Sequence, residues 1–252
     1  MESERQRRSK HKRSRRPTQY YANSVATTCL ILQHGDIEIN PGPVNTVNNN
    51  LQNRRLISAS LLNARSLRNK SSDIYDYIVD SKLDLCAITE TWLNVNDDAV
   101  RNEVCPSNYI LLDQPRAGHR RGGGTAFMYR ESLFQVKKVD GGELNSFEFS
   151  EYSVRSKHQN LCVIVIYRPP YSDDHKVLTA TFLNCEFANY IEMKVLCREE
   201  LLLLGDFNIR VDAVDDIDAT KFSDLLESLG LVQHVEHATH VHGHTLDFNY
   251  FT

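Results

Sequence analysis

The chain has 252 residues, of which 41% are hydrophobic, and it carries 29 Lys and Arg against 33 Asp and Glu, a formal net charge of −4. This length and apolar content are enough for one sizeable core, which excludes a chain that is disordered throughout. No apolar run approaches the ~20 residues that cross a bilayer, and no apolar segment directly follows the basic start, so neither a membrane span nor secretion is expected.

The charge is unevenly distributed along the chain. Residues 1–16 contain eight basic and two acidic residues, a net of +6, so the remainder carries −10. Residues 1–19 are predicted to be a basic, disordered tail, either a solvated leader or a segment for nuclear import or nucleic-acid contact. The six cysteines lack a C-x-x-C pair, which favours reduced thiols in a nuclear or cytoplasmic protein.

Regular structure is predicted to begin near Leu56, after a moderately apolar segment within 20–43 and an Asn-rich linker at 44–55. Apolar and alternating runs predict strands at 56–62, 84–89, 108–112, 124–130, 134–139, 147–154, 161–167 and 201–205. Helical spacing of apolar residues predicts helices at 70–81, 179–196 and 220–229. Buried strands, hairpin-like pairs and covering helices together indicate an α/β sandwich.

Polar residues follow several of the predicted strands directly. In layered α/β folds, strand ends are where separate chain segments converge on one site. A carboxylate placed there suits Mg²⁺, an amide can donate to a phosphate oxygen, and a second carboxylate can orient an attacking water. Each residue taken alone is better explained as part of a turn or a helix cap. The residues concerned are Asn63, Glu90, Tyr167, Arg168, Asp206 and Asn208.

Six short sequence motifs occur in a characteristic order along the chain. They are LLNARSL (61–67), ITETWL (88–93), RRGGGTAFMYR (120–130), VIYRPP (165–170), LLLLGDFN (201–208) and ATHVHGHTLD (238–247). Their order and spacing over 56–252 resemble the endonuclease/exonuclease/phosphatase family, most closely the apurinic-type endonuclease domain of LINE-like (non-LTR) retrotransposons. This resemblance implies a four-layer sandwich of two mixed sheets flanked by helices. It also implies Mg²⁺-dependent cleavage of DNA, with Mn²⁺ as a substitute and no small-molecule cofactor, and a reverse transcriptase as partner in the full element.

The resemblance also implies roles for individual residues. Glu90 matches a metal-binding glutamate, Asn63 an asparagine near the metal and the phosphate, and Tyr167 a tyrosine close to the scissile phosphate. Asp206 matches the residue that aligns and deprotonates the water, and Asn208 the one that stabilises the transition state. Asp247 matches the aspartate that pairs with a catalytic histidine.

Three further residues are candidates for contact with the DNA backbone. Thr239 resembles a phosphate-binding threonine, although Ala238 stands where relatives often carry proline. Arg168 is a candidate for a charge-assisted phosphate contact. Arg121, with Arg116 and Arg120 beside the glycines at 122–124, supplies charge where glycine permits close approach, or else belongs to a hairpin turn that enters the strand at 124–130.

The resemblance fails at one point. The family carries a histidine after the aspartate, in a Ser-Asp-His motif, whereas all ten histidines here precede Asp247. The expectation is a C-terminally truncated domain without its last strand and histidine motif, whose activity is weak or absent. The alternatives are a small-substrate phosphoesterase of the same superfamily and a non-catalytic nucleic-acid-binding remnant.

A second motif lies upstream, where residues 36–43 read Asp-Ile-Glu-Ile-Asn-Pro-Gly-Pro. Asn-Pro and Pro-Gly restrict the backbone, so a turn is the simplest interpretation. The pattern D-x-E-x-N-P-G-P nevertheless resembles a ribosome-skipping (2A-like) peptide. The residues that carry this resemblance are Asn40, Pro41, Gly42 and Pro43, and it implies that one product ends at Gly42 and the next begins at Pro43.

Overall fold

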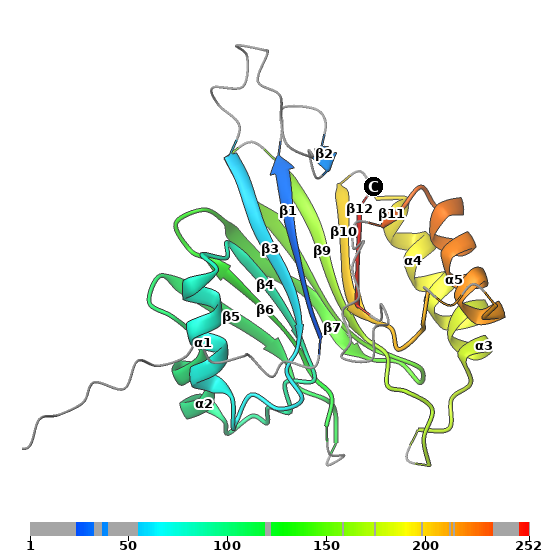
Figure 1. The fold of residues 1–252 in the computed structure, drawn as a ribbon, viewed down its shortest axis with the longest axis horizontal. Coiled ribbons are helices and arrows are strands. Elements are labelled where there is room, and N and C mark those ends of the chain that lie inside the picture. Colours follow the sequence, from blue (N-terminus) through cyan, green and yellow to red (C-terminus); the bar gives the residue numbers. More distant parts are fainter. Residues whose placement is uncertain are drawn as a thin grey trace, which may run out of the picture.

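The computed structural model describes residues 24–32, 37–39, 55–118, 122–157, 159–173, 175–197, 199–211, 213, 215–233 and 247–251. Within these residues the strands form two mixed sheets of six strands each, which face one another, with helices on both outer faces (Figure 1). The predicted four-layer α/β sandwich is confirmed. The described helices include none that is long and apolar enough to cross a membrane.

The first sheet has the strand order β2-β1-β3-β4-β6-β5. Its strands are β1 (Ser24–Leu32), β2 (Ile37–Ile39), β3 (Arg55–Asn63), β4 (Leu85–Thr89), β5 (Tyr109–Gln114) and β6 (Thr125–Arg130). Strands β3 and β4 run parallel, and every other neighbouring pair is antiparallel. The side chains of β4 are buried throughout, as expected for a central strand that is covered on both faces.

The second sheet has the order β11-β12-β10-β9-β8-β7. Its strands are β7 (Gln135–Glu143), β8 (Glu148–Arg155), β9 (Asn160–Tyr167), β10 (Glu200–Asp206), β11 (Val232–Gln233) and β12 (Asp247–Phe251). Here β9 and β10 form the parallel pair. Each sheet thus places one parallel pair inside antiparallel strands, although no repeat is visible in the sequence.

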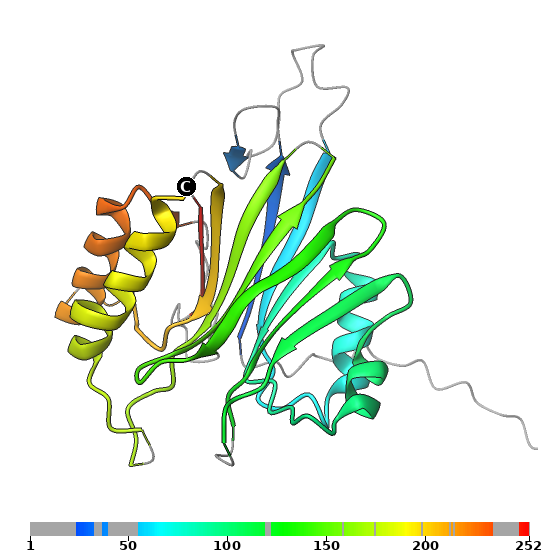
Figure 2. The ribbon, with the colours of Figure 1, turned by 180° about the vertical axis from the view of Figure 1, so that it is seen from behind.

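Helices cover the outer face of each sheet, as the view from behind also shows (Figure 2). The first sheet is covered by α1 (Ser71–Asp80) and α2 (Asp98–Val104). The second is covered by α3 (Thr179–Thr181), the π-helical turn η1 (Phe182–Glu186), α4 (Phe187–Val195) and α5 (Ile217–Ser228). The buried apolar residues form three clusters, one under each helical layer and one between the sheets. The inter-sheet cluster includes Leu61, Ala87, Val165 and Leu204.

The prediction that regular structure begins near Leu56 is wrong, because β1 pairs along β3 over nine residues, with Ser24 opposite Asn63. Two adjacent threonines interrupt the apolar run of β1, but threonine favours strands, so they do not end it. The helix predicted at 179–196 is present as the continuous series α3, η1 and α4. Four short elements, β2, α2, β11 and β12, are absent from the predicted strands and helices, since none spans enough residues to show a clear periodicity.

Candidate active site

The site lies where the two parallel strand pairs end. Asn63 is the last residue of β3, beside Thr89 at the end of β4, and Glu90 follows directly. Tyr167 at the end of β9 lies beside Asp206 at the end of β10. Parallel neighbours end on the same edge of a sheet, so each sheet brings two polar side chains to one point. The structure therefore brings together four residues that the sequence singled out.

Asn63 joins the two sheets at this point. Its side-chain nitrogen Nδ2 donates to Glu90 Oε1 at 2.9 Å and to Asp206 Oδ2 at 2.6 Å. Its oxygen Oδ1 accepts from the backbone N–H of Arg65 at 3.1 Å. Because the carboxylates only accept and the backbone N–H only donates, these partners determine the orientation of the amide. Asn63 and Asp206 are both buried.

In this geometry the role of Asn63 differs from the metal-binding role predicted for it. It turns N–H groups, not its oxygen, toward the two carboxylates, and so holds Glu90 and Asp206 near each other. The hard oxygen donors of the site are then the two carboxylates. No group of three or more His, Cys, Asp or Glu that could hold a metal ion occurs among the residues that the structure describes. Two carboxylates fit Mg²⁺, which keeps several waters and takes one or two protein carboxylates.

Tyr167 lies in the same acidic surroundings. Burial is the main cause that raises the pKa of its hydroxyl above the ordinary range, and the negative charges of Glu90 and Asp206 raise it further, while Arg116 lowers it. The hydroxyl therefore stays protonated and is a hydrogen-bond donor next to Glu90.

Asp206 and Asn208 form a tight turn at the end of β10. The backbone N–H of Asn208 donates to Asp206 Oδ1 at 3.2 Å, and Asn208 Nδ2 donates to the carbonyl of Arg168 at 2.8 Å. Asn208 has a left-handed backbone with φ of 49°, which asparagine tolerates better than most residues. The turn fixes Asp206 and ties the chain after β10 to the chain after β9.

Arg168 occupies a different place from the predicted phosphate contact. Its side chain is buried, Nη1 donates to the carbonyl of Phe207 at 3.0 Å, and Nη2 donates to Thr179 Oγ1 at 2.8 Å. The guanidinium also lies over the ring of Phe182, 5.3 Å from its centre. Since neighbouring residues of a strand point to opposite faces, Tyr167 faces the other sheet and Arg168 faces the helices. The geometry favours a structural role for Arg168, bracing the segment that carries Asp206.

The glycine run 122–124 supports the site as a turn into β6, which agrees with the hairpin interpretation. The backbone N–H of Trp92 donates to the carbonyl of Gly123 at 2.9 Å. A Cβ on Gly123, where φ is +70°, would lie 2.3 Å from Arg116 Nε, so only glycine leaves room for this arginine. Arg116 Nε donates to Glu148 Oε1 at 2.5 Å, and Glu148 Oε2 accepts from the N–H of Gly124 at 2.6 Å. This buried ion pair links the first sheet to β8.

Trp92 and Glu148 are residues that the sequence analysis did not assign to the site, and Arg116 was considered only as a contact for the DNA backbone. Trp92 Nε1 donates to Glu90 Oε2 at 3.3 Å. A signal was present for Glu148, a carboxylate on the face of β8 that also carries Tyr152 and Val154. The pairing of Arg116 with Glu148 gave no signal, because the two residues are 32 positions apart in the sequence.

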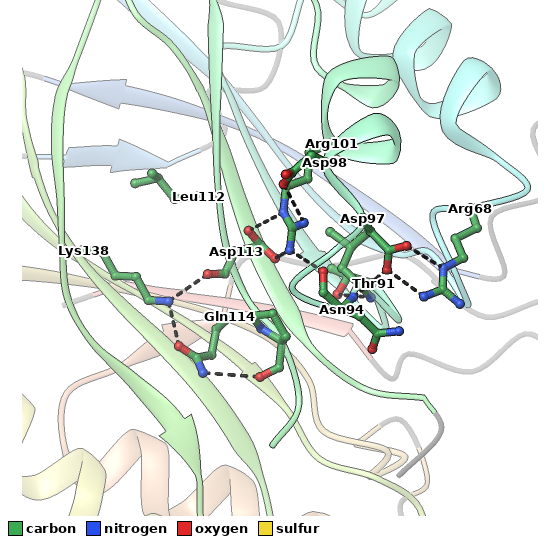
Figure 3. Close-up of polar contacts among 12 residues, drawn as sticks. Arg68, Thr91, Asn94, Asp97, Asp98, Arg101, Leu112, Asp113, Gln114 and Lys138 are labelled. Atoms are coloured by element: carbon green, nitrogen blue, oxygen red, sulfur yellow. Dashed lines mark hydrogen bonds and ion pairs between the residues drawn. The ribbon is translucent and has the colours of Figure 1, made fainter. Parts of the chain in front are cut away.

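The loop after Glu90 is tied to its surroundings by ion pairs (Figure 3). Arg101 in α2 pairs with Asp113 of β5 at 2.8 Å and donates to the carbonyl of Asn94 at 2.9 Å. Asp97 accepts from the N–H of Asn94 at 2.6 Å and pairs with Arg68 at 2.6 Å. The segment that carries Glu90 and Trp92 is thereby fixed between α2, β5 and the chain after β3.

A layer of hydroxyls separates the site from the inter-sheet core. Thr125 and Ser150 face each other across the sheets, with 2.8 Å between their side-chain oxygens. Thr89 Oγ1 is buried and has no hydrogen-bond partner among the described residues. The side chains below the site are thus polar, although the deeper inter-sheet layer is apolar.

Several predicted residues fall outside this description. Arg121, Thr239 and the string Asn40, Pro41, Gly42 and Pro43 lie outside the described residues. Asp247 begins β12, with its backbone opposite Asp206, so that position lies at the same strand ends as the site.

The fold and the site together define an α/β sandwich with an acidic, asparagine-bridged site at the ends of two parallel strand pairs. Residues 50–252 match the model of the endonuclease/exonuclease/phosphatase family, and the chain belongs to that family. Members of this family are metal-dependent phosphoesterases.

Solved structures with the same fold are distant in sequence. The endonuclease domain of TRAS1, a telomere-specific non-LTR retrotransposon, is 13% identical with a TM-score of 0.54, covering 75% of this chain and 82% of that one. An AP endonuclease from Leishmania major is 14% identical with a TM-score of 0.55, over 75% and 77% of the two chains. A mannosyl-6-phosphatase from Bacteroides thetaiotaomicron is 11% identical with a TM-score of 0.53, over 74% and 77%. A search of curated proteins finds no significant match.

Proposed function

We propose that this protein is a Mg²⁺-dependent phosphodiesterase that nicks DNA, of the kind encoded by non-LTR retrotransposons. The observation that carries the proposal is the amide of Asn63, which donates to Glu90 from its own sheet and to Asp206 from the other. Two carboxylates held by a neutral donor supply a ligand for one cation and a base for one water. Mn²⁺ is expected to replace Mg²⁺, since oxygen ligands suit both cations.

In this proposal each carboxylate has its own task. Glu90 would hold the cation, which when bound supplies charge neutralisation at a phosphate oxygen and a more acidic water. Asp206, fixed by the N–H of Asn208, orients the attacking water and accepts its proton. Tyr167 donates to a phosphate oxygen from its protonated hydroxyl. The second N–H of the Asn208 amide would stabilise the negative charge that develops on the phosphate oxygens in the transition state.

The choice of DNA over a small phosphoester rests on the strings LLNARSL, VIYRPP and GHTLD, which resemble the element-type nucleases. One exposed basic residue near the site agrees with this choice, because Arg65 follows Asn63 by two positions and is exposed. The rest of the chain is acidic, so binding is expected to depend on a local basic rim and to weaken steeply with salt.

The test is nicking of supercoiled plasmid with Mg²⁺ and with EDTA. Asp206→Asn keeps the shape of the side chain and removes the base, so nicking should fall by ~10²–10⁴-fold. Glu227→Gln, on the exposed side of α5, is the matched control and should nick as the wild type does. Binding of DNA without nicking would favour a non-catalytic remnant, and release of phosphate from a soluble phosphoester would favour the phosphatase alternative.

We also propose that the string ending in Asn40, Pro41, Gly42 and Pro43 acts as a ribosome-skipping peptide. A break after Gly42 would separate β1 and β2 from the rest of the chain and leave β3 as an edge strand, an exposed edge that invites pairing. Translation in a eukaryotic lysate tests the proposal. Two products are expected from the wild type and one from Pro43→Ala, whereas a single product from both would reject skipping.

A further inference from the structure

Both oxygens of the Glu90 carboxylate accept a hydrogen bond from a named side chain. Oε1 accepts from Asn63 Nδ2 at 2.9 Å, and Oε2 accepts from Trp92 Nε1 at 3.3 Å. The first donor belongs to β3 and the second to the loop after β4, so the carboxylate is held from two sides.

Two donors matter because the terminal torsion of a glutamate is broad and leaves the plane of its carboxylate poorly defined. A hydrogen bond on each oxygen fixes that plane. Each carboxylate oxygen has two lone-pair sites, so with the hydroxyl of Tyr167 as a third donor one of the four sites remains for a cation. Glu90 is therefore oriented without being blocked.

The position of Trp92 is itself enforced by its surroundings. Its backbone has φ of 54°, which is unusual for an aromatic residue, and its backbone N–H donates to the carbonyl of Gly123. Its indole nitrogen would lie 3.5 Å from a Cβ on Gly122, and Arg116 Nη1 would lie 3.7 Å from the same point. The indole and Arg116 thus flank one glycine.

Arg116 is in turn anchored by the other sheet. It pairs with Glu148 at the start of β8, and Glu148 also holds the N–H of Gly124. The glycine run and the indole that rests on it are therefore fixed by a buried ion pair that crosses between the sheets.

We propose that Trp92 is a positioning residue that sets the orientation of the Glu90 carboxylate for its cation, with the Arg116–Glu148 pair holding the indole in place. The inference rests on the proposed function, in which Glu90 holds Mg²⁺. Removing a partner that orients a metal ligand typically costs 10–100-fold in metal affinity.

The chain has a single tryptophan, so its fluorescence reports on position 92 alone. Mg²⁺ added to the wild-type protein should change that fluorescence with a saturable dependence, and Glu90→Gln should abolish the change. Calorimetric titration with Mg²⁺ gives the affinity itself, independent of any nicking.

Trp92→Phe keeps an aromatic ring and removes the N–H, and it should weaken Mg²⁺ binding by about 10-fold or more. Replacing the one tryptophan by benzothienylalanine keeps the bicyclic shape without the N–H, which separates loss of the hydrogen bond from loss of packing. Tyr77→Phe is the matched control, since it removes an aromatic hydroxyl that hydrogen-bonds to Ser60 instead of the site, and its Mg²⁺ affinity should be that of the wild type.

The outcomes separate the two proposals. If the wild type binds Mg²⁺ and the benzothienylalanine protein binds it with the same affinity, the positioning role of Trp92 is overturned. The cation site of the proposed function would stand. No binding of Mg²⁺ by folded wild-type protein would overturn this inference together with the cation site of the proposed function. Weaker binding in both Trp92 variants, with or without nicking, would support the positioning role.

Discussion

Asn63 Nδ2 lies 2.6 Å from Asp206 Oδ2, although the two residues are 143 positions apart in the chain and belong to different sheets. Both are buried, so the hydrogen bond forms in surroundings where an unpaired charge is costly. The bond lets two carboxylates approach the same amide without a cation between them. It makes the acidic site compatible with a folded protein before any metal binds.

Replacing Asn63 by aspartate should therefore make folding dependent on the cation. The variant exchanges the shared donor for a third carboxylate, and without Mg²⁺ it should lose about 3 kcal/mol of unfolding free energy, as buried charges do when left uncompensated. Urea denaturation with EDTA and with Mg²⁺ measures this, and Mg²⁺ should recover much of the loss. Asn69→Asp adds the same charge at an exposed position and should behave as the wild type does. Equal destabilisation with and without Mg²⁺ would contradict a cation site here.

Arg168→Gln should lower stability and leave the salt dependence of DNA binding unchanged. Glutamine is shorter and lacks the fork of donors that reaches both the carbonyl of Phe207 and Thr179 Oγ1, so about 2–3 kcal/mol of unfolding free energy should be lost. Urea denaturation and the slope of DNA affinity against salt concentration are the measurements. A salt slope lower by about one unit with full stability would instead restore Arg168 as a phosphate contact.

Thr89→Val should be neutral or stabilising, by up to about 1 kcal/mol, because it removes a buried hydroxyl without a partner and keeps the branched shape. Thr125→Val is the matched comparison on the neighbouring strand. It breaks the hydrogen bond to Ser150 and leaves that hydroxyl buried alone, so a loss of about 1–2 kcal/mol is expected. Thermal or urea unfolding of the two variants under the same conditions measures both changes in unfolding free energy. A loss in Thr89→Val as large as that in Thr125→Val would show that the Thr89 hydroxyl has a partner.

Protonation of Glu186 should lower the free energy of unfolding in acid. Burial alone would raise the pKa of this carboxyl, but hydrogen bonds from Ser146 and Asn145 hold the pKa below its ordinary value of 4.5. Since the folded pKa is the lower one, the stabilisation is complete above about pH 4.5 and is lost as the pH falls through the folded pKa. The measurement is the unfolding free energy against pH.

Glu186→Gln should remove part of that dependence below pH 4.5. Glu192→Gln, at an exposed position in α4, is the control and should keep the wild-type dependence. The same acid profile in wild type and Glu186→Gln would refute the assignment.

The residues of the site that could be predicted from the sequence are those at the ends of strands. Asn63, Glu90, Tyr167 and Asp206 each end an apolar run, and parallel strands bring such ends together. The direction of Arg168 could also have been inferred, because strand alternation turns it away from Tyr167. The type and position along the chain of the long strands from β3 to β10 followed from the same apolar patterns.

Other features depend on contacts that no local pattern contains. Trp92 reaches Glu90 because the glycines at 122–124 let Arg116 approach, and Arg116 is there because Glu148 holds it from the other sheet. Asn63 looks like a ligand from its residue type, and only its partners show that its N–H groups face the carboxylates. Strand β1 was missed since its interrupted apolar run gives no clear period, whereas its pairing with β3 defines it.

The two halves of the active site belong to different sheets, and the apolar side chains of the inter-sheet cluster set the distance between them. Leu61 lies two positions before Asn63, and Leu204 two positions before Asp206, both in that cluster. A smaller side chain at either position would let the sheets move closer together or slide past each other. The length and angle of the Asn63–Asp206 hydrogen bond would then change. The alignment of the candidate site thus depends on the core, and substitutions that do not touch the site can misalign it while the fold survives.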